Sequence, residues 1–187
     1  MSKAVLISIR PKWVEKIANG EKTIEVRKTK PKLDTPFKCY IYCTLQGCNE
    51  FFRVDLGRDV AKWNRGKWAD RKGKVIGEFT CDRIFSINVF DNGSIQNWLF
   101  EHMERSCLTY EELADYIGNG KTGYGWHISD LLIYDQLREL SEFQRATDPC
   151  DSCHAEYTWE CTGCKKLSGD IKRPPQSWCY VEATKDG

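Results

Sequence analysis

The stretch from Gly20 to Arg27 brings three ionisable side chains that can do chemistry into a short run. Lys22 lies at the entrance of a predicted strand, and Glu25 and Arg27 follow at a spacing of two, which places them on the same face of that strand as Thr23. An ammonium, a carboxylate and a guanidinium at a sheet edge can hold a polar ligand or transfer protons. The alternative interpretation is a solvated edge strand whose charges form ordinary ion pairs.

Four cysteines form a second pattern with chemical meaning. Cys150 and Cys153, then Cys161 and Cys164, give the spacing C-x2-C-x7-C-x2-C. Each C-x2-C turn can direct two thiolates at one ion, so the two turns predict a structural Zn site within residues 148–166. His154 is a possible substitute ligand, and a redox pair or buried thiols are the alternatives. A site closed by four sulfurs has no open position for a substrate, which disfavours catalytic zinc.

The net charge of +1 results from two opposite halves. Residues 1–74 carry 18 Lys and Arg against 8 Asp and Glu, whereas residues 75–187 carry 10 against 19. This asymmetry predicts a basic face that meets a polyanion, and the alternative is that the two halves pair their charges within one fold. The candidate phosphate or base contacts in the basic half are Arg10, Lys22, Arg27 and Lys28.

Aromatic residues near these charges are candidates for stacking against bases. Residues 45–73 form a basic excursion that contains Trp63 and Trp68, and its polar composition offers little core. Tyr124 and Trp126 alternate with glycines at the start of a predicted strand, where glycine permits close approach of a ligand. Trp68, Tyr124 and Trp126 are therefore the predicted aromatic contacts.

The elements that must position these side chains are mostly strands. Apolar runs and alternation predict strands at 4–9, 23–27, 37–44, 74–87, 126–134 and 178–183. Helical spacing and stop signals predict helices at 11–19, 94–103 and 109–117, the last with a capping box that begins at Thr109. Strands with about three helices between them predict an α+β fold built on a curved mixed sheet or a small barrel.

Length and composition point to one cytoplasmic domain. The 187 residues suffice for a single domain over 1–187, and a hydrophobic share of 41% can bury a core. No run of 18 apolar residues and no signal pattern occur, so we expect neither membrane spanning nor secretion. Six further cysteines lack ligand spacing and are predicted core residues: Cys39, Cys43, Cys48, Cys81, Cys107 and Cys179.

Several of these segments together resemble a known family. The run Leu6–Pro11, the short helix after it and the G-x-K-x-x-E-x-R pattern of residues 20–27 resemble the ASCH domain, the activating-signal-cointegrator homology domain of the PUA-like superfamily. The segment 123–128 fits the same pattern, and the tail 174–181 is similar to that of phage and bacterial members. The excursion and the cysteine segment go beyond a minimal domain of this type.

The resemblance implies a PUA-like mixed β-barrel with flanking helices and a cleft suited to RNA, nucleotides or a modified base. Some members are amidohydrolases that deacylate N4-acetylcytidine with a Lys, a Thr and a Glu. Their Lys corresponds to Lys22, their Thr position holds Glu25 here, and Glu78 is a candidate for their hydrolytic Glu. Ribonuclease activity is also ascribed to the family, but His102, His127 and His154 are scattered in the sequence and are interpreted as structural.

Three hypotheses of function follow. The first is a module that binds RNA, single-stranded nucleic acid or a nucleotide through Arg10, Lys22, Glu25 and Arg27. The second is an amidohydrolase or nuclease acting on a modified nucleoside or RNA, with Lys22 and Glu25 in catalytic roles. The third is a regulatory factor whose basic face binds an acidic protein.

Overall fold

The computed structural model describes residues 2–45, 71–96, 100–146 and 169–184. Within them the chain divides into two compact units. The first comprises residues 1–12, 38–78 and 133–187, and the second comprises residues 13–37 and 79–132. The single domain expected from the chain length stays a prediction, and each unit is described by itself.

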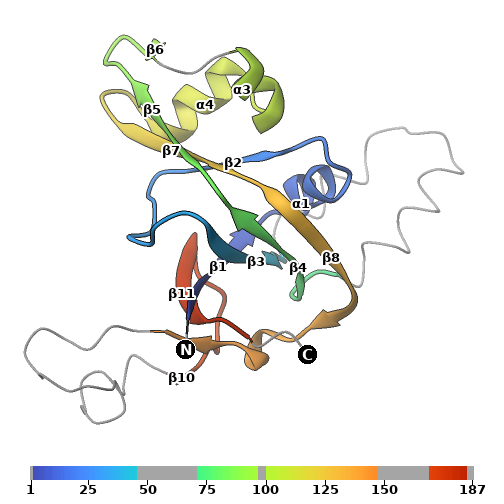
Figure 1. Ribbon diagram of the computed structural model, residues 1–187. Helices are drawn as coiled ribbons and strands as arrows, with labels where there is room; N and C mark the ends of the chain where they lie inside the picture. The colour runs from blue at the N-terminus through green and yellow to red at the C-terminus, as the bar shows by residue number, and fades with distance from the viewer. Residues whose placement is uncertain (1, 46–70, 97–99, 147–168, 185–187) are drawn as a thin grey trace, which may run out of the picture. The chain divides into compact units, whose positions relative to one another are not determined.

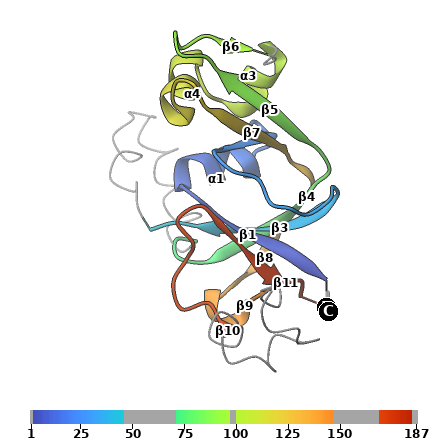
Figure 2. The same cartoon turned by 90° about the vertical axis from the view of Figure 1, so that its left-hand side faces the viewer.

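The first unit contains most of a seven-stranded sheet. Its strand order is β10-β9-β11-β1-β3-β4-β8 (Figure 2). The strands are β1 (Lys3–Ile9), β3 (Phe37–Cys43), β4 (Val75–Cys81), β8 (Ser129–Arg138), β9 (Gln144–Arg145), β10 (Gly169–Asp170) and β11 (Trp178–Glu182). β1 runs parallel to β3 and antiparallel to β11, so the first and last long strands are neighbours. The predicted strands at 4–9, 37–44 and 178–183 are confirmed.

The core of the first unit forms where apolar residues from these strands meet. Tyr40 packs edge-on against Phe143, with 4.9 Å between ring centroids, and Phe143 follows a short 3-10 helix, η2 (Leu140–Glu142). Leu6, Val75 and Val181 join the same buried cluster. Four of the predicted core cysteines are buried: Cys39, Cys43, Cys81 and Cys179. Cys107 is only half-buried, and Cys48 lies outside the described residues.

The second unit combines a four-stranded sheet with helices. The sheet has the order β2-β7-β5-β6, with β2 (Ile24–Arg27), β5 (Ile84–Val89), β6 (Ile95–Gln96) and β7 (Thr122–His127). The helices are α1 (Pro11–Ala18), α3 (Phe100–Ser106) and α4 (Tyr110–Ile117) (Figure 1). The predicted capping box is confirmed, because Thr109 and Glu112 exchange hydrogen bonds at the start of α4.

The two faces of this four-stranded sheet differ in character. Val26 and Ile87 pack with Leu113 and Ile117 of α4 in one buried apolar cluster. The residues that alternate with these, Glu25 and Arg27 on β2 and Tyr124 on β7, therefore belong to the opposite face. Helix packing thus fixes which side of β2 presents its charges.

Three predicted elements differ in detail from those of the structure. The helix expected at 94–103 is the strand β6 followed by α3, because the turn at Asn92 and Gly93 returns the chain along β5. The expected strands at 74–87 and 126–134 are each two strands, broken at 82–83 and at Ile128. The strands described here form two sheets, and no closed barrel occurs among them. Alternation of residue types predicts strands but does not reveal whether a sheet closes.

Candidate functional site

The turn after α1 delivers Lys22 to the start of β2. Gly20 adopts a positive φ of 77° and its amide donates to the carbonyl of Ile17, which ends the helix. The amides of Glu21 and Lys22 then both donate to the carbonyl of Lys16, so the chain turns back before the strand begins. Glycine at this position is what allows the left-handed turn without strain.

Lys22, Glu25 and Arg27 form a buried ionic group, referred to below as the charge cluster. Glu25 Oε1 lies 2.9 Å from Arg27 Nη2, and Glu25 Oε2 lies 3.4 Å from Lys22 Nζ. The residues are 2%, 5% and 7% exposed for Lys22, Glu25 and Arg27. The predicted alignment of Glu25 and Arg27 on one face of β2 is confirmed by their ion pair. The alternative of a solvated edge strand does not apply, because these charges are buried.

The surroundings of Lys22 explain how a lysine is held in the interior. Its Nζ donates a hydrogen bond of 2.6 Å to the carbonyl of Ser106, at the end of α3, and lies 5.1 Å from the ring centre of Trp13. Burial lowers the pKa of Lys22 from its ordinary value, against the opposing effect of the Glu25 carboxylate. Two cations around one carboxylate leave the charge cluster with a surplus of positive charge.

Strand register extends the cluster across the sheet. Arg27 pairs with Tyr124 of β7, and Tyr124 pairs with Ser86 of β5. Paired residues share a face, so these residues form a continuous row. We name the following set the polar sheet face: Glu25, Arg27, Ser86, Asn88, Thr122 and Tyr124. Ser86 and Thr122 are exposed and Tyr124 is half-buried, so this row leads from solvent to the charge cluster.

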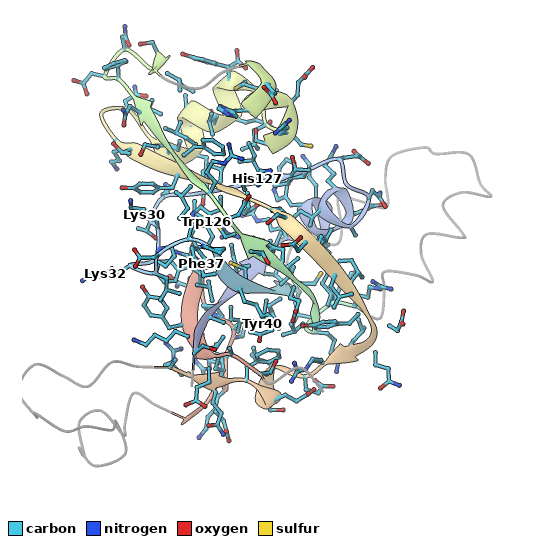
Figure 3. All side chains as sticks on the ribbon, viewed as in Figure 1. Lys30, Lys32, Phe37, Tyr40, Trp126 and His127 are labelled. Carbon is cyan, nitrogen blue, oxygen red and sulfur yellow. The ribbon has the colours of Figure 1, made fainter. Side chains whose placement is uncertain are left out.

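Two exposed lysines that follow β2 lie over tyrosine rings. Lys30 Nζ is 5.4 Å from the ring centre of Tyr124, and Lys28 Nζ is 5.2 Å from that of Tyr116 on α4. Lys30 is labelled in Figure 3. Such cation–π contacts hold a lysine at the surface while its charge stays available to an anion. Lys30 therefore lies beside the polar sheet face, whereas Lys28 contacts α4, which packs on the other face of the sheet.

The other predicted site residues have different surroundings. Trp126 pairs with Glu25 but is fully buried and packs edge-on against Phe37, with 5.9 Å between centroids (Figure 3). Arg10 follows β1 and is exposed. Glu78 belongs to the first unit, where it accepts a hydrogen bond of 2.5 Å from Tyr134 and pairs with Lys38 at 2.8 Å. Trp68 and the cysteines Cys150, Cys153, Cys161 and Cys164 lie outside the described residues.

Sequence reasoning missed two partners of the site. Lys22 donates to the carbonyl of Ser106, which is 84 residues away in the sequence. A backbone acceptor of this kind cannot be predicted from the pattern of side chains. Tyr116 of α4 contacts Lys28, and no local pattern predicts this contact because the two residues are far apart in the sequence. His127 Nδ1 lies 2.6 Å from Asp82 Oδ1, and its structural role stays a prediction.

Comparisons with known proteins identify the fold. Neither the search of protein families nor that of curated proteins yields a match. Among solved structures, the ASCH protein from Zymomonas mobilis superposes with a TM-score of 0.54 at 17% identity, covering 96% of this chain and 87% of that one. A single-substitution variant of the same protein gives 0.54 at 18% identity, covering 97% and 91%. The chain has an ASCH-like fold.

The ASCH-like fold accommodates the mixed α+β architecture expected from the sequence. Within the described ranges, no group of three or more His, Cys, Asp or Glu residues is placed to hold a metal ion. In the same ranges, no helix is both long and apolar enough to cross a membrane. The charge cluster joins two ion pairs at one buried carboxylate of the second unit.

Proposed function

We propose that the protein binds RNA, single-stranded nucleic acid or a nucleotide through the polar sheet face and its flanking lysines. The observation that carries the proposal is the buried charge cluster, which continues by strand register to the half-exposed Tyr124 and the Lys30 above it. An ASCH-like fold supports the proposal, because nucleic-acid binding is what resemblance to this family implies.

The chemistry of each part fits a nucleotide. Exposed lysines such as Lys28 and Lys30 supply the charge that phosphates need, and contacts of this kind give affinity with little sequence preference. Tyr124 offers an aromatic face on which a base can stack. Glu25 and Arg27 offer an acceptor and donors for a base edge, deeper along the same row. Arg10 is a further predicted phosphate contact, and Trp68 a further predicted stacking residue.

Fluorescence anisotropy with a labelled 12-nucleotide RNA, its DNA counterpart and a duplex tests the proposal. We expect binding that weakens steeply with salt. The K28A/K30A variant should bind more weakly, with a salt slope reduced by about 1.4 because each lost phosphate contact on a single strand contributes about 0.7. Lys172, an exposed lysine of the first unit, provides the control K172A. The proposal fails if no nucleic acid or nucleotide binds, or if K28A/K30A and K172A behave alike.

One observation favours a hydrolytic alternative. Burial lowers the pKa of Lys22, and its Nζ lies beside a carboxylate, as a general acid–base pair requires. In amide hydrolysis, Glu25 would take a proton from water as the water oxygen bonds to the amide carbon, while the Lys22 ammonium donates a hydrogen bond to the amide oxygen. The carbon–nitrogen bond would then break, and the amine would leave with the proton held by Glu25. Incubation with N4-acetylcytidine tests this: acetate should appear with the wild type and not with K22A. Release of acetate by both proteins, or by neither, rejects the hydrolytic alternative. Fragments in a parallel incubation with RNA would indicate a nuclease.

The zinc site rests on the sequence pattern, and we propose it on that ground. Cys150, Cys153, Cys161 and Cys164 would hold one structural zinc ion that supplies folding energy to the segment 148–166. Elemental analysis of purified protein should find about one equivalent, and C161S should retain much less. Less than half an equivalent in the wild type rejects the site. The phage or bacterial type and the cytoplasmic location likewise remain predictions from the sequence.

A further inference from the structure

The charge cluster presents its hydrogen-bonding groups in a defined order. Lys22 Nζ lies on the Oε2 side of Glu25, at 3.4 Å, and Arg27 Nη2 lies on the Oε1 side, at 2.9 Å. The carboxylate is therefore flanked by a donor on each side. The resulting order is donor, acceptor, donor, and all three groups are nine-tenths buried.

Glu25 retains capacity for a ligand. Oε2 is buried and, among the residues that the structure describes, accepts no hydrogen bond. Its distance of 3.4 Å to Lys22 Nζ is longer than a charge-assisted hydrogen bond of about 2.8 Å. An ammonium has three donors, and the carbonyl of Ser106 uses one of those on Lys22. A buried acceptor without a hydrogen bond is costly unless a ligand satisfies it.

We propose that the charge cluster recognises the imide edge of uracil or thymine, an inference that rests on the proposed binding function. That edge presents carbonyl, N–H and carbonyl, the complement of donor, acceptor and donor. The base N3–H would donate to Glu25, and its two carbonyl oxygens would accept from Lys22 and Arg27. No bond is made or broken in this recognition.

The other bases fit this order less well. Cytosine and adenine turn a ring-nitrogen acceptor toward the carboxylate, so two acceptors would face each other. Guanine satisfies Glu25 with its N1–H but turns its amino group, a donor, toward one of the cations. In a buried site each such mismatch leaves a polar group without a partner, which is the main source of discrimination between bases.

The neighbouring residues support a base in this position. Tyr124 lies directly across from Arg27 on β7, so its half-buried ring flanks the outer end of the cluster. Lys30, over the Tyr124 ring, is placed for the phosphate of the same nucleotide. Trp126 lies across from Glu25 and is fully buried, which makes the inner end apolar. Hydrogen bonds in such surroundings are stronger than in water.

Binding of the wild-type protein to short homopolymers tests the inference from the ligand side. The probes are oligo(U), oligo(dT), oligo(C), and oligo(U) in which every uridine carries either an N3-methyl or a 5-methyl group. We expect oligo(U) and oligo(dT) to bind at least about tenfold more tightly than oligo(C). N3-methylation removes the imide donor and should abolish this preference, whereas 5-methylation, which leaves the imide edge intact, should preserve it. A difference between oligo(U) and oligo(dT) separates RNA from DNA as the source of the base.

A matched pair of variants tests the protein side. E25Q replaces the carboxylate with an amide of the same shape, which offers one acceptor and one donor in place of two acceptors. Its amino group can pair with the ring nitrogen of cytosine, so E25Q should weaken the preference for uracil over cytosine while keeping the salt slope. E104Q makes the same charge change at an exposed position of α3 and should bind as the wild type does. If E25Q does not fold, binding of the N3-methylated and 5-methylated oligo(U) to the wild-type protein still tests the inference. Equal affinity for oligo(U) and oligo(C) overturns the inference and leaves the proposed function standing, whereas failure of every probe to bind overturns both.

Discussion

Replacement of Glu25 by glutamine should destabilise the protein far more than any surface charge change. The substitution keeps the shape of the side chain but leaves Lys22 and Arg27 as two buried cations without a counter-charge. Removal of one partner of a buried ion pair costs about 3–5 kcal/mol, because the remaining charge stays desolvated. Because the free energy of unfolding of a typical protein is about 5–15 kcal/mol, E25Q should still fold at low temperature.

The expected loss depends on pH. The folded-state pKa of Lys22 is below its unfolded value, so the unfolded state binds more protons between these two values and stability rises with pH across that window. Without the carboxylate, the pKa of Lys22 falls further. The difference in the free energy of unfolding between E25Q and the wild type should therefore shrink as the pH is raised towards 10, because Lys22 then becomes neutral.

Urea denaturation followed by circular dichroism measures these differences, with E104Q as the control at an exposed site. We expect E104Q to lie within about 0.5 kcal/mol of the wild type. Adding K22M to E25Q removes one of the two uncompensated cations, so the double variant should lose less than the sum of the single losses. A loss below about 0.5 kcal/mol for E25Q, unchanged by pH, would refute the argument that the cluster is desolvated.

Three further predictions concern the second unit. T109A removes the hydroxyl that accepts from the Glu112 amide at the start of α4 and should cost about 1 kcal/mol, measured by thermal unfolding, while an unchanged Tm would contradict the capping role. G123A places a methyl group 2.6 Å from Ile117 Cδ1 in the core and should cost about 1–3 kcal/mol, and I117V in the same chain should recover part of this loss if the clash is its cause. Burial tends to raise the pKa of Asp82, but the hydrogen bond and charge of His127 bring it below 3.8. D82N should therefore destabilise the protein slightly at pH 7, and its difference in stability from the wild type should vanish as the pH falls through that lowered pKa. A constant difference down to pH 2 would exclude this ion pair as its source.

The amino-acid sequence predicts the local part of this site well. The glycine that ends α1, the strand that follows it and the shared face of Glu25 and Arg27 all depend on neighbours a few residues apart. Short-range rules for helix ends and strand alternation therefore suffice to predict them.

What the sequence did not predict depends on contacts between distant segments. The burial of Lys22 rests on a carbonyl of α3, and the row from Arg27 to Ser86 requires the pairing of three strands. Alternation along one strand does not fix the neighbour that it takes, so neither the row nor the open form of the sheets was predictable. Asn92 and Gly93 are typical of a hairpin turn rather than of a helix. These two residues therefore offered a signal against the helix expected at 94–103.

The pairing of β1 with β11 has a consequence for synthesis of the chain. Lys3 of β1 pairs with Glu182 of β11, so this part of the seven-stranded sheet requires residues from both ends of the sequence. Contacts of such long sequence separation form slowly, because the loop between them must close first. On the ribosome, β1 waits until β11 emerges, whereas all residues of the second unit are already available. Until then the apolar edge of β1 can pair with other chains, which makes nascent or C-terminally shortened protein prone to aggregate.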